Sequence, residues 1–383
     1  MRSIVLGAGR QGLAIAYDLG RHGGAEEITL VDARAKVVRA AAKRLRGLVP
    51  GLRVKQHAKA LKGADAVTLM RGHDVAVSAM PYRFNPALAK AAVRARVNFC
   101  DLGGNTALVK EALKLRPQAA KAGVTIVPDC GLAPGLGNVL AALAMAEVHG
   151  VQHVRIRCGG LPIDATGPLG YSLLFSIEGL TNEYRGEAVV VRDGRVQRFE
   201  AFTECENIQG PPGMGMLECF FTSGGTSTAP WRYRSKLQTY EYKTVRYHGH
   251  FDKMRAMIDL GLLDLEPVRV GDKKIVPREV WQAVAGPRLQ NDDVRDLAFL
   301  RVEATDAAGR GVRYEMLQRF DDKTGFTAME QTTGYPTAVV AQALARGELR
   351  PGAMTPDQAG FGAEHLRDLR ARGLNIRRDV LSR

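Results

Sequence analysis

Three glycines close to the amino terminus have the spacing of a loop that holds a phosphate group. Gly7, Gly9 and Gly12 follow an apolar run at residues 4–6, and a helical pattern of small residues begins directly after them. In a turn from a strand into a helix, the first glycine permits the tight turn, the second lets a pyrophosphate approach the backbone, and the third lets the helix pack close to the strand. Free N–H groups at the helix start then favour the anion. The spacing therefore predicts a dinucleotide-binding turn.

An acidic residue stands where the ribose of that dinucleotide is expected. The apolar run at residues 28–31 predicts a second strand, and it ends in Asp32, 20 positions after Gly12. A carboxylate at this place accepts hydrogen bonds from both ribose hydroxyls and repels a 2′-phosphate, which favours NAD. The positive charge of Arg34, two residues further on, leaves NADP possible. Further cofactor contacts are expected from the neighbours of these groups: Arg10, Gln11, Ala33 and Arg34.

Strands and helices alternate regularly through the first part of the chain. Short apolar or β-branched runs at residues 54–57, 75–79, 97–100 and 124–127 are separated by helical segments. This alternation predicts an α/β fold with a doubly wound parallel sheet of the Rossmann type. Ligands of such sheets bind outside the carboxyl ends of the strands. Further cofactor contacts are therefore predicted in the loops at those ends: Ser78, Ala79, Met80, Pro81, Gly103 and Gly131.

The same loops carry groups that can transfer protons. Asp101 ends a predicted strand, and it either serves the site or caps the glycine turn that follows it. Asp129 and Cys130 stand among glycines and prolines in residues 128–137, and Cys130 either lies near the nicotinamide or is a buried structural cysteine. Two more residues further along the chain have side chains suited to acid–base chemistry. The catalytic candidates, without a ranking among them, are Asp101, Asp129, Cys130, Glu178 and His250.

Beyond residue 150 the pattern changes from alternating helices and strands to β-branched and alternating segments. A hairpin signal at residues 193–194 is one of several. We predict a dinucleotide-binding domain over residues 1–135 and a mainly antiparallel α+β domain for substrate binding and oligomerisation over residues 136–330. A helical segment over residues 331–383 is expected to pack at the domain junction, with Pro336 in the first turn of its first helix.

Arg246 is the predicted anchor for a substrate carboxylate. The segment around it also carries His248 and His250, which strand alternation would place on one face. No third ligand is visible in the sequence, so no metal site is predicted. Tyr82, after the turn at Pro81, is expected to lie over the cleft and contact the substrate. Four other hydroxyl-bearing residues are expected either to hydrogen-bond the substrate or to pack the domain junction: Tyr184, Thr222, Thr333 and Tyr335.

Composition excludes several classes of function. The chain of 383 residues has a net charge of +14, but its basic residues are scattered and not interleaved with aromatic side chains. This favours a solvated basic surface over nucleic-acid binding. No apolar run approaches the roughly 20 residues of a membrane helix. Five cysteines without a C-x-x-C pair indicate neither a disulfide framework nor a zinc knuckle. We expect a cytoplasmic protein with no membrane or nucleic-acid partner.

A series of short motifs follows one order along nearly the whole chain: residues 7–12, 78–82, 99–104, 128–135, 158–162, 168–171, 176–179, 221–228 and 332–336. In this order the motifs resemble the saccharopine dehydrogenase-like family of amino-acid dehydrogenases. The glycine pair at residues 224–225 is most similar to the members of that family that act on the ε-amine of lysine.

The resemblance implies NAD-dependent oxidative deamination of the L-lysine ε-amine to 2-aminoadipate 6-semialdehyde, with release of ammonia. Such a site needs a proton acceptor for the amine, an activated water for the imine, a cation for the α-carboxylate and an acid for the α-ammonium. A saccharopine dehydrogenase or reductase and a carboxyspermidine-type dehydrogenase, both acting on a secondary amine, remain open. A non-catalytic NAD-binding regulator is a further alternative. The family also implies a small amino-acid substrate and a homodimer or higher homo-oligomer.

Overall fold

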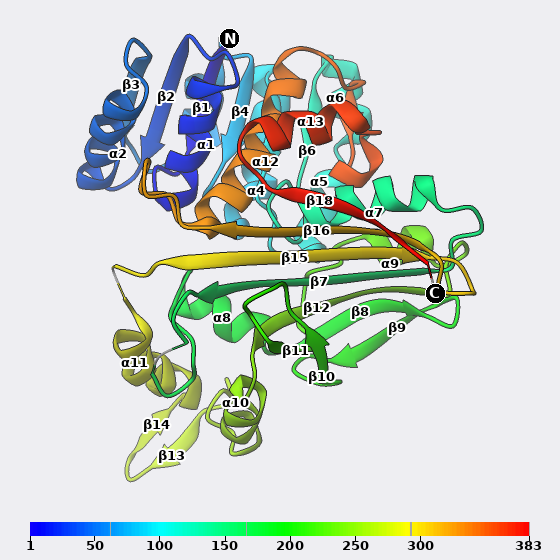
Figure 1. Cartoon of the computed structure of the whole chain (residues 1–383). Helices are drawn as coiled ribbons and strands as arrows, with labels where there is room; N and C mark the ends of the chain where they lie inside the picture. Colours follow the sequence, from blue (N-terminus) through cyan, green and yellow to red (C-terminus); the bar gives the residue numbers. More distant parts are fainter. Residues whose placement is uncertain (62, 166, 292, 383) are drawn as a thin grey trace.

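The computed structural model describes residues 1–61, 63–165, 167–291 and 293–382, and its first sheet is parallel throughout (Figure 1). The strands are β1 (Arg2–Leu6), β2 (Glu27–Asp32), β3 (Arg53–Ala58), β4 (Val75–Ser78), β5 (Asn98–Asp101), β6 (Thr125–Val127) and β17 (Gly352–Ala353). They lie in the order β17-β6-β5-β4-β1-β2-β3, and every neighbouring pair is parallel. The predicted doubly wound α/β fold is confirmed.

Helices cover both faces of this sheet. On one face lie α1 (Arg10–Arg21), α2 (Ala35–Leu48) and α12 (Ala328–Ala345); on the other lie α3 (Gly63–Met70), α4 (Asn85–Ala95) and α6 (Arg116–Ala122). A further helix, α5 (Thr106–Leu113), follows β5. Along β1, Val5 packs with the first set, whereas Ile4 and Leu6 pack with the second. Because both faces of a parallel sheet are buried, its strands are continuous apolar runs in the sequence.

The second sheet is mixed and mainly antiparallel. Its strands are β7 (His153–Pro162), β8 (Glu187–Arg192), β9 (Arg195–Glu200), β10 (Glu206–Gln209), β11 (Met216–Phe220), β12 (Thr239–Tyr247), β15 (Asp296–Thr305), β16 (Gly311–Arg319) and β18 (Ile376–Leu381). The path runs β10-β11-β12-β7-β15-β16-β18, and β8 pairs with both β12 and β9. The pair β12–β7 is parallel, and the others are antiparallel. The predicted antiparallel α+β part is confirmed.

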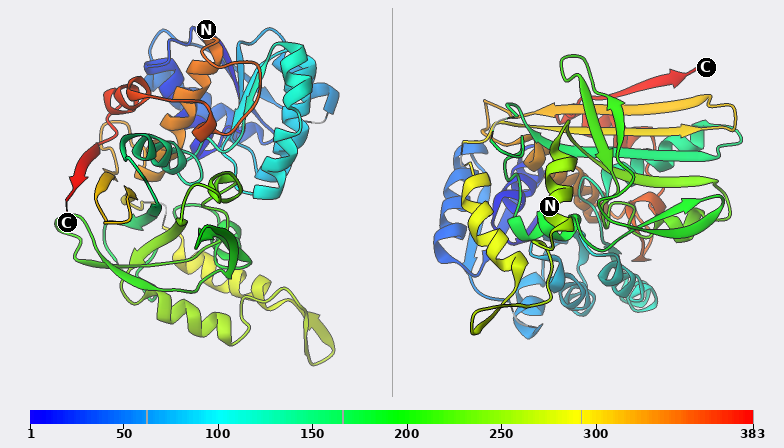
Figure 2. Two further views of the ribbon diagram at one scale, coloured as in Figure 1. Left: turned by 90° about the vertical axis from the view of Figure 1, so that its right-hand side faces the viewer. Right: turned by 90° about the horizontal axis from the view of Figure 1, so that it is seen from below.

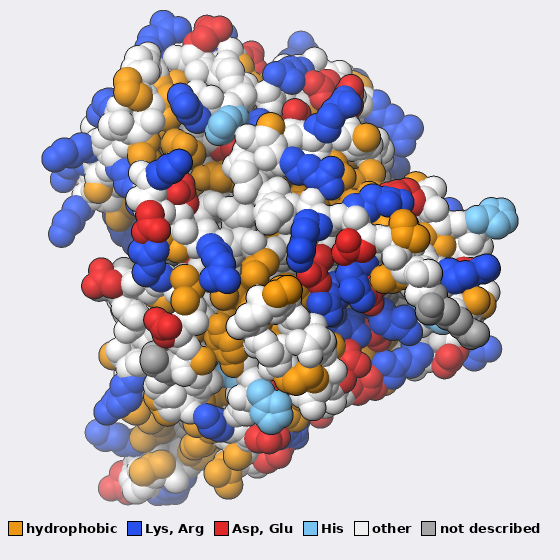
Figure 3. Space-filling model, viewed as in Figure 1, with side chains coloured by type: hydrophobic (Ala, Val, Ile, Leu, Met, Phe, Trp, Pro, Cys, Tyr) orange, Lys and Arg blue, Asp and Glu red, His pale blue; other side chains and the backbone are white. Residues whose placement is uncertain are grey.

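The two faces of the second sheet have different chemistry. One face packs its apolar side chains, such as Val154 and Ile156, under α7 (Leu136–Glu147). The other face carries ion pairs, among them Arg157 with Glu241, whose Nη2 and Oε1 atoms lie 2.6 Å apart. Figure 3 shows these charges gathered over β8 and β12, at the right of the view. The same face also holds a small buried apolar cluster that includes Leu217, Val245 and Phe299.

Smaller elements surround the second sheet: α8 (Ile177–Glu183), α9 (Ala229–Tyr233), α10 (His250–Asp259), α11 (Pro277–Leu289) and the hairpin of β13 (Val268–Val270) and β14 (Lys273–Ile275). The hairpin stands out from the rest of the molecule (Figure 2, left). Short 3₁₀ helices, η1 (Tyr82–Phe84) and η2 (Pro356–Gln358), and α13 (Ala363–Ala371) complete the fold. Among the described residues, no helix has the length and apolarity to cross a bilayer.

The start predicted for the helix around Pro336 is wrong. The helix α12 begins eight residues earlier, at Ala328, and contains Pro336 in its interior. Thr327 and Glu330 cap its first turn reciprocally, and the Asp296 carboxylate accepts from the N–H groups of Ala328 and Met329 at 2.6 and 3.0 Å. Because Asp296 comes from β15, this capping contact has no signature in the local sequence.

The last part of the chain contributes to both sheets. The strand β17 pairs with β6 in the first sheet, and β18 pairs with β16 in the second. The helix α12 lies along α1, so closely that a Cβ on Gly334 would lie 2.8 Å from the Cβ of Ala14. Arg372, after α13, donates to the buried Asp18 carboxylate at 2.9 Å. The three-part division at residues 135 and 330 stays a prediction, but residues 331–382 tie the two sheets together.

Candidate active site

The turn between β1 and α1 has the shape that a dinucleotide requires. Gly7 has a φ of +96°, and a Cβ on it would lie 2.7 Å from the Ala79 backbone oxygen. A Cβ on Gly12 would lie 1.8 Å from the Gly7 oxygen, so no side chain fits there. Around Gly9, apart from its chain neighbours, no described atom lies within 4 Å of the Cβ position. A tight turn beside an open backbone position at a helix N-terminus fits the pyrophosphate of an NAD(P) cofactor.

The Asp32 carboxylate lies at the end of β2, beside the glycine turn. Its Oδ2 accepts a hydrogen bond from the Ala8 N–H at 3.1 Å, and its Oδ1 accepts from the Arg34 N–H at 2.9 Å. The exposed Arg34 guanidinium also lies 3.3 Å from Oδ1, with Ala33 between the two residues in the chain. These contacts hold the carboxylate at the strand end where a ribose is expected.

Arg10 and Gln11, predicted at the pyrophosphate, contact α12. Arg10 Nε donates to Glu330 Oε1 at 2.8 Å, and Gln11 Nε2 donates to the Met329 oxygen at 3.2 Å. The Arg10 side chain is still 51% exposed, so its role at the cofactor stays a prediction. In the structure both side chains connect the cofactor-binding helix α1 to the start of α12.

The remaining predicted cofactor residues lie at the ends of β4, β5 and β6 or in the loops after them. Ser78 ends β4, and Ala79, Met80 and Pro81 follow it in the loop. The Ser78 hydroxyl is buried and donates to Asn85 Oδ1 at 2.8 Å, so it stabilises this loop. Gly103 and Gly131 follow β5 and β6 in the same way. The carboxyl ends of the neighbouring strands β1, β4, β5 and β6 therefore lie along one edge of the sheet, where open parallel sheets bind their ligands.

A cleft of about 570 Å³ opens beside these loops, between the first sheet and the strands β7 and β12 of the second. This volume lies within the range of small-molecule sites. The end of α8 and the start of α12 complete its walls. The polar side chains that line it are Tyr82, Asn105, Cys158, Asn182, Glu183, Ser223, Tyr242, Arg246 and Thr333.

Among the described residues that line the cleft, Arg246 and Glu183 are the charged ones. Arg246 Nη2 lies 3.5 Å from Glu183 Oε2, and Thr244 Oγ1 donates to Glu183 Oε1 at 2.6 Å. The guanidinium carbon lies 4.8 Å from the centre of the Tyr171 ring. The cleft wall thus carries one cation and one anion, which lie side by side and pair with each other.

Three of the six predicted substrate-binding residues line the cleft, and three do not. Tyr82, Thr333 and Arg246 line the cleft. Tyr184 and Thr222 are buried behind its wall, with exposed fractions of 0% and 2%. The hydroxyl of Tyr184 accepts from Arg246 Nε at 2.8 Å, so it touches the cleft through that residue.

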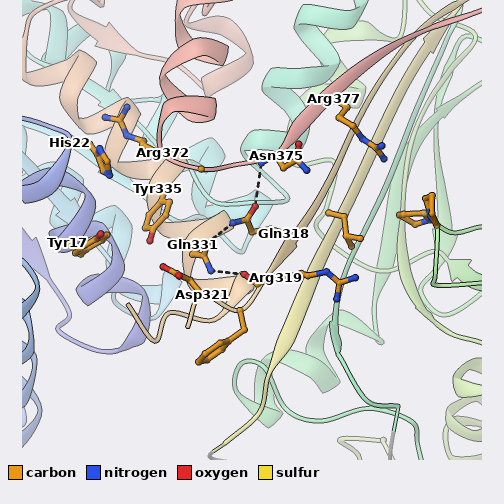
Figure 4. Close-up of a pocket in the computed structure, with 15 residues that line it drawn as sticks. Tyr17, His22, Gln318, Arg319, Asp321, Gln331, Tyr335, Arg372, Asn375 and Arg377 are labelled. Atoms are coloured by element: carbon orange, nitrogen blue, oxygen red, sulfur yellow. Dashed lines mark hydrogen bonds between the residues drawn. The ribbon is translucent and has the colours of Figure 1, made fainter. Parts of the chain in front are cut away.

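Tyr335 lies in a different cavity, of about 640 Å³, which α1, α12, β16 and residues 372–377 border (Figure 4). In Figure 4 its side chain lies between those of Tyr17 and Arg372. The rings of Tyr335 and Tyr17 are tilted against each other with centres 6.2 Å apart. This position corresponds to the junction-packing alternative and separates Tyr335 from the cleft.

Asp101 and Asp129 form a pair of buried carboxyl groups next to the cleft. Asp101 Oδ1 accepts from the N–H groups of Gly103 at 2.7 Å and Asp129 at 3.2 Å, so it caps the glycine turn. Burial raises the pKa of Asp101 to about 6. Burial, with Asp101 nearby, raises the pKa of Asp129 to about 7. Asp129 Oδ2 accepts from Ser227 Oγ, while Oδ1 has no hydrogen-bond partner among the described residues.

None of the five catalytic candidates lines the cleft, and the other three are Glu178, Cys130 and His250. Glu178 is exposed on the first turn of α8. Cys130 is 1% exposed, and its thiol donates to the Val127 oxygen at 3.2 Å; burial raises the pKa of this thiol. His250 lies behind Arg246, and burial lowers its pKa to about 3, which keeps the imidazole neutral. The structure therefore does not bring these three residues together.

The predicted placement of His248 and His250 on one strand face is wrong. The strand β12 ends at Tyr247, and Gly249, with a φ of +88°, turns the chain into α10, which begins at His250. A left-handed glycine ends the alternation of side chains on which the prediction depended. In the part of the chain that the structure describes, no three His, Cys, Asp or Glu side chains are arranged to hold a metal ion.

Six of the polar residues that line the cleft were not among the candidates from the sequence: Asn105, Cys158, Asn182, Glu183, Ser223 and Tyr242. Cys158 lies at 3% exposure on β7, and burial raises the pKa of its thiol to about 12. The sequence has a signal near this position, because Gly159 next to Cys158 is a glycine inside a strand, which marks the close approach of another backbone. In the structure, a Cβ on Gly159 would lie 2.2 Å from the Val245 oxygen. Glu183 has no comparable local signal.

The two parts of the chain match two domains of one protein family. Residues 3–127 match the saccharopine dehydrogenase NADP binding domain, and residues 131–374 match the saccharopine dehydrogenase C-terminal domain. The chain belongs to the saccharopine dehydrogenase family. The predicted family resemblance is confirmed, and so is the NAD(P)-binding character of the amino-terminal domain.

Several named proteins are similar to this chain in sequence. The chain is 26% identical over 234 residues to saccharopine dehydrogenase [NADP(+), L-glutamate-forming] of Saccharomyces cerevisiae, covering 57% of this chain and 50% of the relative. It is 25% identical over 383 residues to mitochondrial alpha-aminoadipic semialdehyde synthase of Mus musculus, covering 81% of this chain and 41% of the relative. The chain thus spans half or less of the length of these relatives.

A solved structure shares the fold over its whole length. Apo saccharopine dehydrogenase (L-Glu forming) from Saccharomyces cerevisiae superimposes with a TM-score of 0.79 at 19% identity, with 100% of both chains covered. This match confirms the combination of a parallel Rossmann-type sheet with a separate mixed sheet.

The raised pKa of Asp129 predicts a dependence of stability on pH. An acid whose pKa is higher in the folded state stabilises the fold below its unfolded value near 4, and this contribution is lost as the pH rises through about 7. Since one pKa unit corresponds to about 1.4 kcal/mol, Asp129 contributes at most about 4 kcal/mol. We expect Asp129→Asn to gain stability relative to the natural protein as the pH rises from about 4 to about 8.

Urea unfolding of both proteins across this pH range measures the difference. Asp18, whose pKa is also raised, is present in both proteins and cancels. Asp101 interacts with Asp129, so the measured difference includes the coupling between these two carboxyl groups. Asp272→Asn, which removes an exposed carboxylate in the β13–β14 turn, is the matched control. A constant difference between Asp129→Asn and the natural protein at all pH values would contradict the assignment.

Proposed function

We propose that the protein is an NAD-dependent lysine 6-dehydrogenase, which oxidatively deaminates the ε-amine of L-lysine to 2-aminoadipate 6-semialdehyde and releases ammonia. One observation carries this proposal: the described lining of the cleft holds one cation, Arg246, and one acid, Glu183. Lysine has one α-carboxylate and one α-ammonium besides the reacting amine, so its charges match this pair. Saccharopine has three carboxylates, and a single arginine leaves two of them without a cationic partner.

In this proposal the charged pair orients the substrate by its α-carbon. Arg246 donates to the α-carboxylate, and Glu183 accepts from the α-ammonium. The flexible side chain of lysine then extends along the cleft toward the loops after β5 and β6, where Gly104 and Gly131 line the wall. Because glycine has no side chain, the backbone is open on that side, and the amine-bearing carbon can approach the bound cofactor. The Tyr82 ring lies 3.2 Å from the Cβ position of Gly104 and covers this end.

Proton transfer is the second requirement, and Asp129 fits it best among the five candidates. The ε-ammonium must lose a proton before its carbon can lose a hydride, and the imine must then gain a water. Asp129 has a pKa raised to about 7 by burial and one carboxyl oxygen without a described partner. A proton acceptor works best with a pKa near the operating pH. Its φ of +64° is a strained conformation, which functional sites often hold. When bound, the nicotinamide ring accepts the hydride.

The preference for NAD follows from Asp32. The carboxylate is held at the end of β2 by the N–H groups of Ala8 and Arg34, and it accepts hydrogen bonds from ribose hydroxyls but repels a 2′-phosphate. The matching family domain and the named yeast relative are described with NADP. Arg34 gives this chain a cation near the same place. We propose NAD as the physiological cofactor on the strength of the Asp32 charge.

A second candidate function has its own support. The relatives with names are saccharopine dehydrogenases and alpha-aminoadipic semialdehyde synthases, and the solved structure that shares the whole fold is a saccharopine dehydrogenase. An enzyme of that kind oxidises a secondary amine instead of a primary one. Asn105, Asn182 and Ser223 in the cleft offer neutral hydrogen bonds to additional carboxylates. The two activities differ in the substrate and not in the carbon–nitrogen bond that is oxidised.

A direct assay separates the candidates. The purified protein is mixed with NAD or NADP and with L-lysine, saccharopine or L-norleucine, and the reduced cofactor is followed by its absorbance. We expect reduction with lysine and NAD, and none with norleucine, which has the α-groups but no ε-amine. Reduction with saccharopine alone would replace the first proposal by the second. Cofactor binding without turnover of either amine would favour a regulatory protein.

A further inference from the structure

We propose that Tyr184 and His250 are positioning residues that hold the Arg246 guanidinium in its orientation toward the cleft. Arg246 Nε donates to the Tyr184 hydroxyl at 2.8 Å, this hydroxyl lies 2.9 Å from His250 Nε2, and His250 Nδ1 lies 3.0 Å from the Leu169 oxygen. The four groups form one continuous chain of hydrogen bonds behind the cleft wall, which we call the Arg246 relay. Its functional meaning rests on the proposed role of Arg246 as the carboxylate anchor.

The backbone carbonyl at the far end determines the direction of every bond in the relay. A carbonyl oxygen can only accept, so Nδ1 of His250 carries the proton and donates to Leu169. Nε2 of the neutral ring is then an acceptor and receives the proton of the Tyr184 hydroxyl. The Tyr184 oxygen keeps its lone pairs for the Nε–H of Arg246. The histidine pKa, lowered to about 3 by burial, keeps the ring neutral and the direction fixed.

Burial makes the relay a rigid support. Tyr184 is 0% exposed, and Arg246 and His250 are each 2% exposed. The Tyr184 and His250 rings also meet edge to face, with centres 5.8 Å apart. On the other side of the guanidinium, the Tyr171 ring lies 4.8 Å from its central carbon. Of the terminal nitrogens, Nη1 donates to the Val245 oxygen at 2.9 Å, and Nη2 lies 3.5 Å from Glu183 Oε2 on the cleft wall. With Nε also engaged by Tyr184, the guanidinium is held in one orientation before the substrate arrives, and this pre-organisation strengthens binding.

The relay also explains two side chains that have the right chemistry but lie outside the cleft. His250 is a titratable ring next to the site, yet its two nitrogens are both engaged by Tyr184 and Leu169. Tyr184 likewise uses its hydroxyl within the relay. Neither therefore touches the substrate, and both act on it through Arg246.

Steady-state kinetics with L-lysine test the relay. Tyr184→Phe removes the hydroxyl that Arg246 Nε contacts and keeps the ring, so we expect KM for lysine to rise about tenfold with little change in kcat. Tyr314→Phe is the matched control, because it removes a buried tyrosine hydroxyl of the second sheet that donates to Glu147, does not line the cleft and leaves the relay intact. We expect its KM to stay within a factor of two. Equal KM values for the two variants overturn the proposal.

A second pair of variants tests His250 and guards against loss of folding. His250→Gln keeps an acceptor for the Tyr184 hydroxyl, whereas His250→Leu has none. We expect the glutamine variant to retain a KM near that of the natural enzyme and the leucine variant to resemble Tyr184→Phe. A purely structural role would impair both variants in proportion to their thermal stability, with no selective change in KM, and would overturn the proposal.

Crystal structures of Tyr184→Phe and Tyr314→Phe provide a readout that does not depend on turnover. The relay predicts that the Arg246 guanidinium rotates or loses its defined position in Tyr184→Phe only. An unchanged guanidinium in Tyr184→Phe overturns the relay even if lysine is the substrate. Absence of lysine turnover in the natural enzyme, with a displaced guanidinium in Tyr184→Phe, instead overturns the proposed function and leaves the relay standing.

Discussion

Replacement of Arg246 by methionine is expected to lower kcat/KM for L-lysine by about 100- to 1,000-fold. The guanidinium is the described cation of the cleft, and methionine has a similar stem without charge. Truncation of one partner of a buried, hydrogen-bonded charge pair costs about 3–4 kcal/mol, and each 1.4 kcal/mol is tenfold. The loss should appear mainly in KM, because the α-carboxylate is bound equally in the ground state and the transition state. Initial rates with lysine and NAD measure it.

A truncated substrate provides the control for this prediction. The diamine 1,5-diaminopentane has the reacting amine and the chain of lysine but no carboxylate. If Arg246 binds the carboxylate, the natural enzyme and Arg246→Met should oxidise this diamine at similar, low rates. An equal loss with both substrates would mean that the substitution damages the site as a whole. Because Arg246 is 2% exposed, the thermal stability of the variant is compared first, and Arg246→Lys, which keeps a cation, serves as the milder variant.

The cofactor turn could be predicted from the sequence because everything it needs is local. The glycine spacing, the strand before it, the helix after it and the acid at the end of the next strand lie within the first 32 residues. Gly12 is required by its close approach to the Gly7 oxygen and Gly7 by its φ of +96°, and both conditions arise within a strand–turn–helix unit. Any fold that keeps this unit keeps the site, so a local pattern is sufficient.

The substrate cleft could be predicted only in part, because it depends on which helix faces turn inward. Glu178 and Glu183 lie five residues apart on the same short helix, α8. Leu180 is buried on it, Glu178 is exposed, and Glu183 at its end faces the cleft. Two identical side chains thus differ in role through the packing of α8 against distant residues. A sequence without the fold does not tell them apart.

At the second sheet, burial gives His250 a role that its residue type alone does not predict. His250 has the side chain that most often transfers protons, but its ring is enclosed and its pKa lowered to about 3. The interruption of the strand by Gly249 places it at the start of α10 instead of beside His248. The capping of α12 by Asp296 is a similar case, since the partner comes from another part of the chain. Such long-range contacts decide which candidate becomes part of the site.

Replacement of Asp32 by alanine is expected to weaken NAD binding about 10- to 100-fold and to improve binding of NADP. The carboxylate contributes charge-assisted hydrogen bonds to the ribose, each worth about 1.5–3 kcal/mol, and its removal ends the repulsion of a 2′-phosphate. The exposed Arg34 guanidinium, which lies 3.3 Å from Asp32 Oδ1, is then available to the phosphate. The ratio of kcat/KM for NADP to that for NAD should rise by more than about 100-fold. Titration of both cofactors by fluorescence gives the affinities, and initial rates give the ratio.

Two variants separate the charge of Asp32 from its structural contact. Asp32 Oδ2 also accepts from the Ala8 N–H at 3.1 Å, and Asp32→Asn keeps an acceptor at this position while removing the charge. If the charge binds the ribose, the asparagine variant should lose nearly as much NAD affinity as the alanine variant. If the contact with the glycine turn matters instead, the asparagine variant should retain NAD affinity, which would remove Asp32 from the ribose-binding role. Arg34→Ala in the Asp32→Ala background should abolish the gain in NADP affinity, because no other guanidinium of the described chain contacts the Asp32 carboxylate.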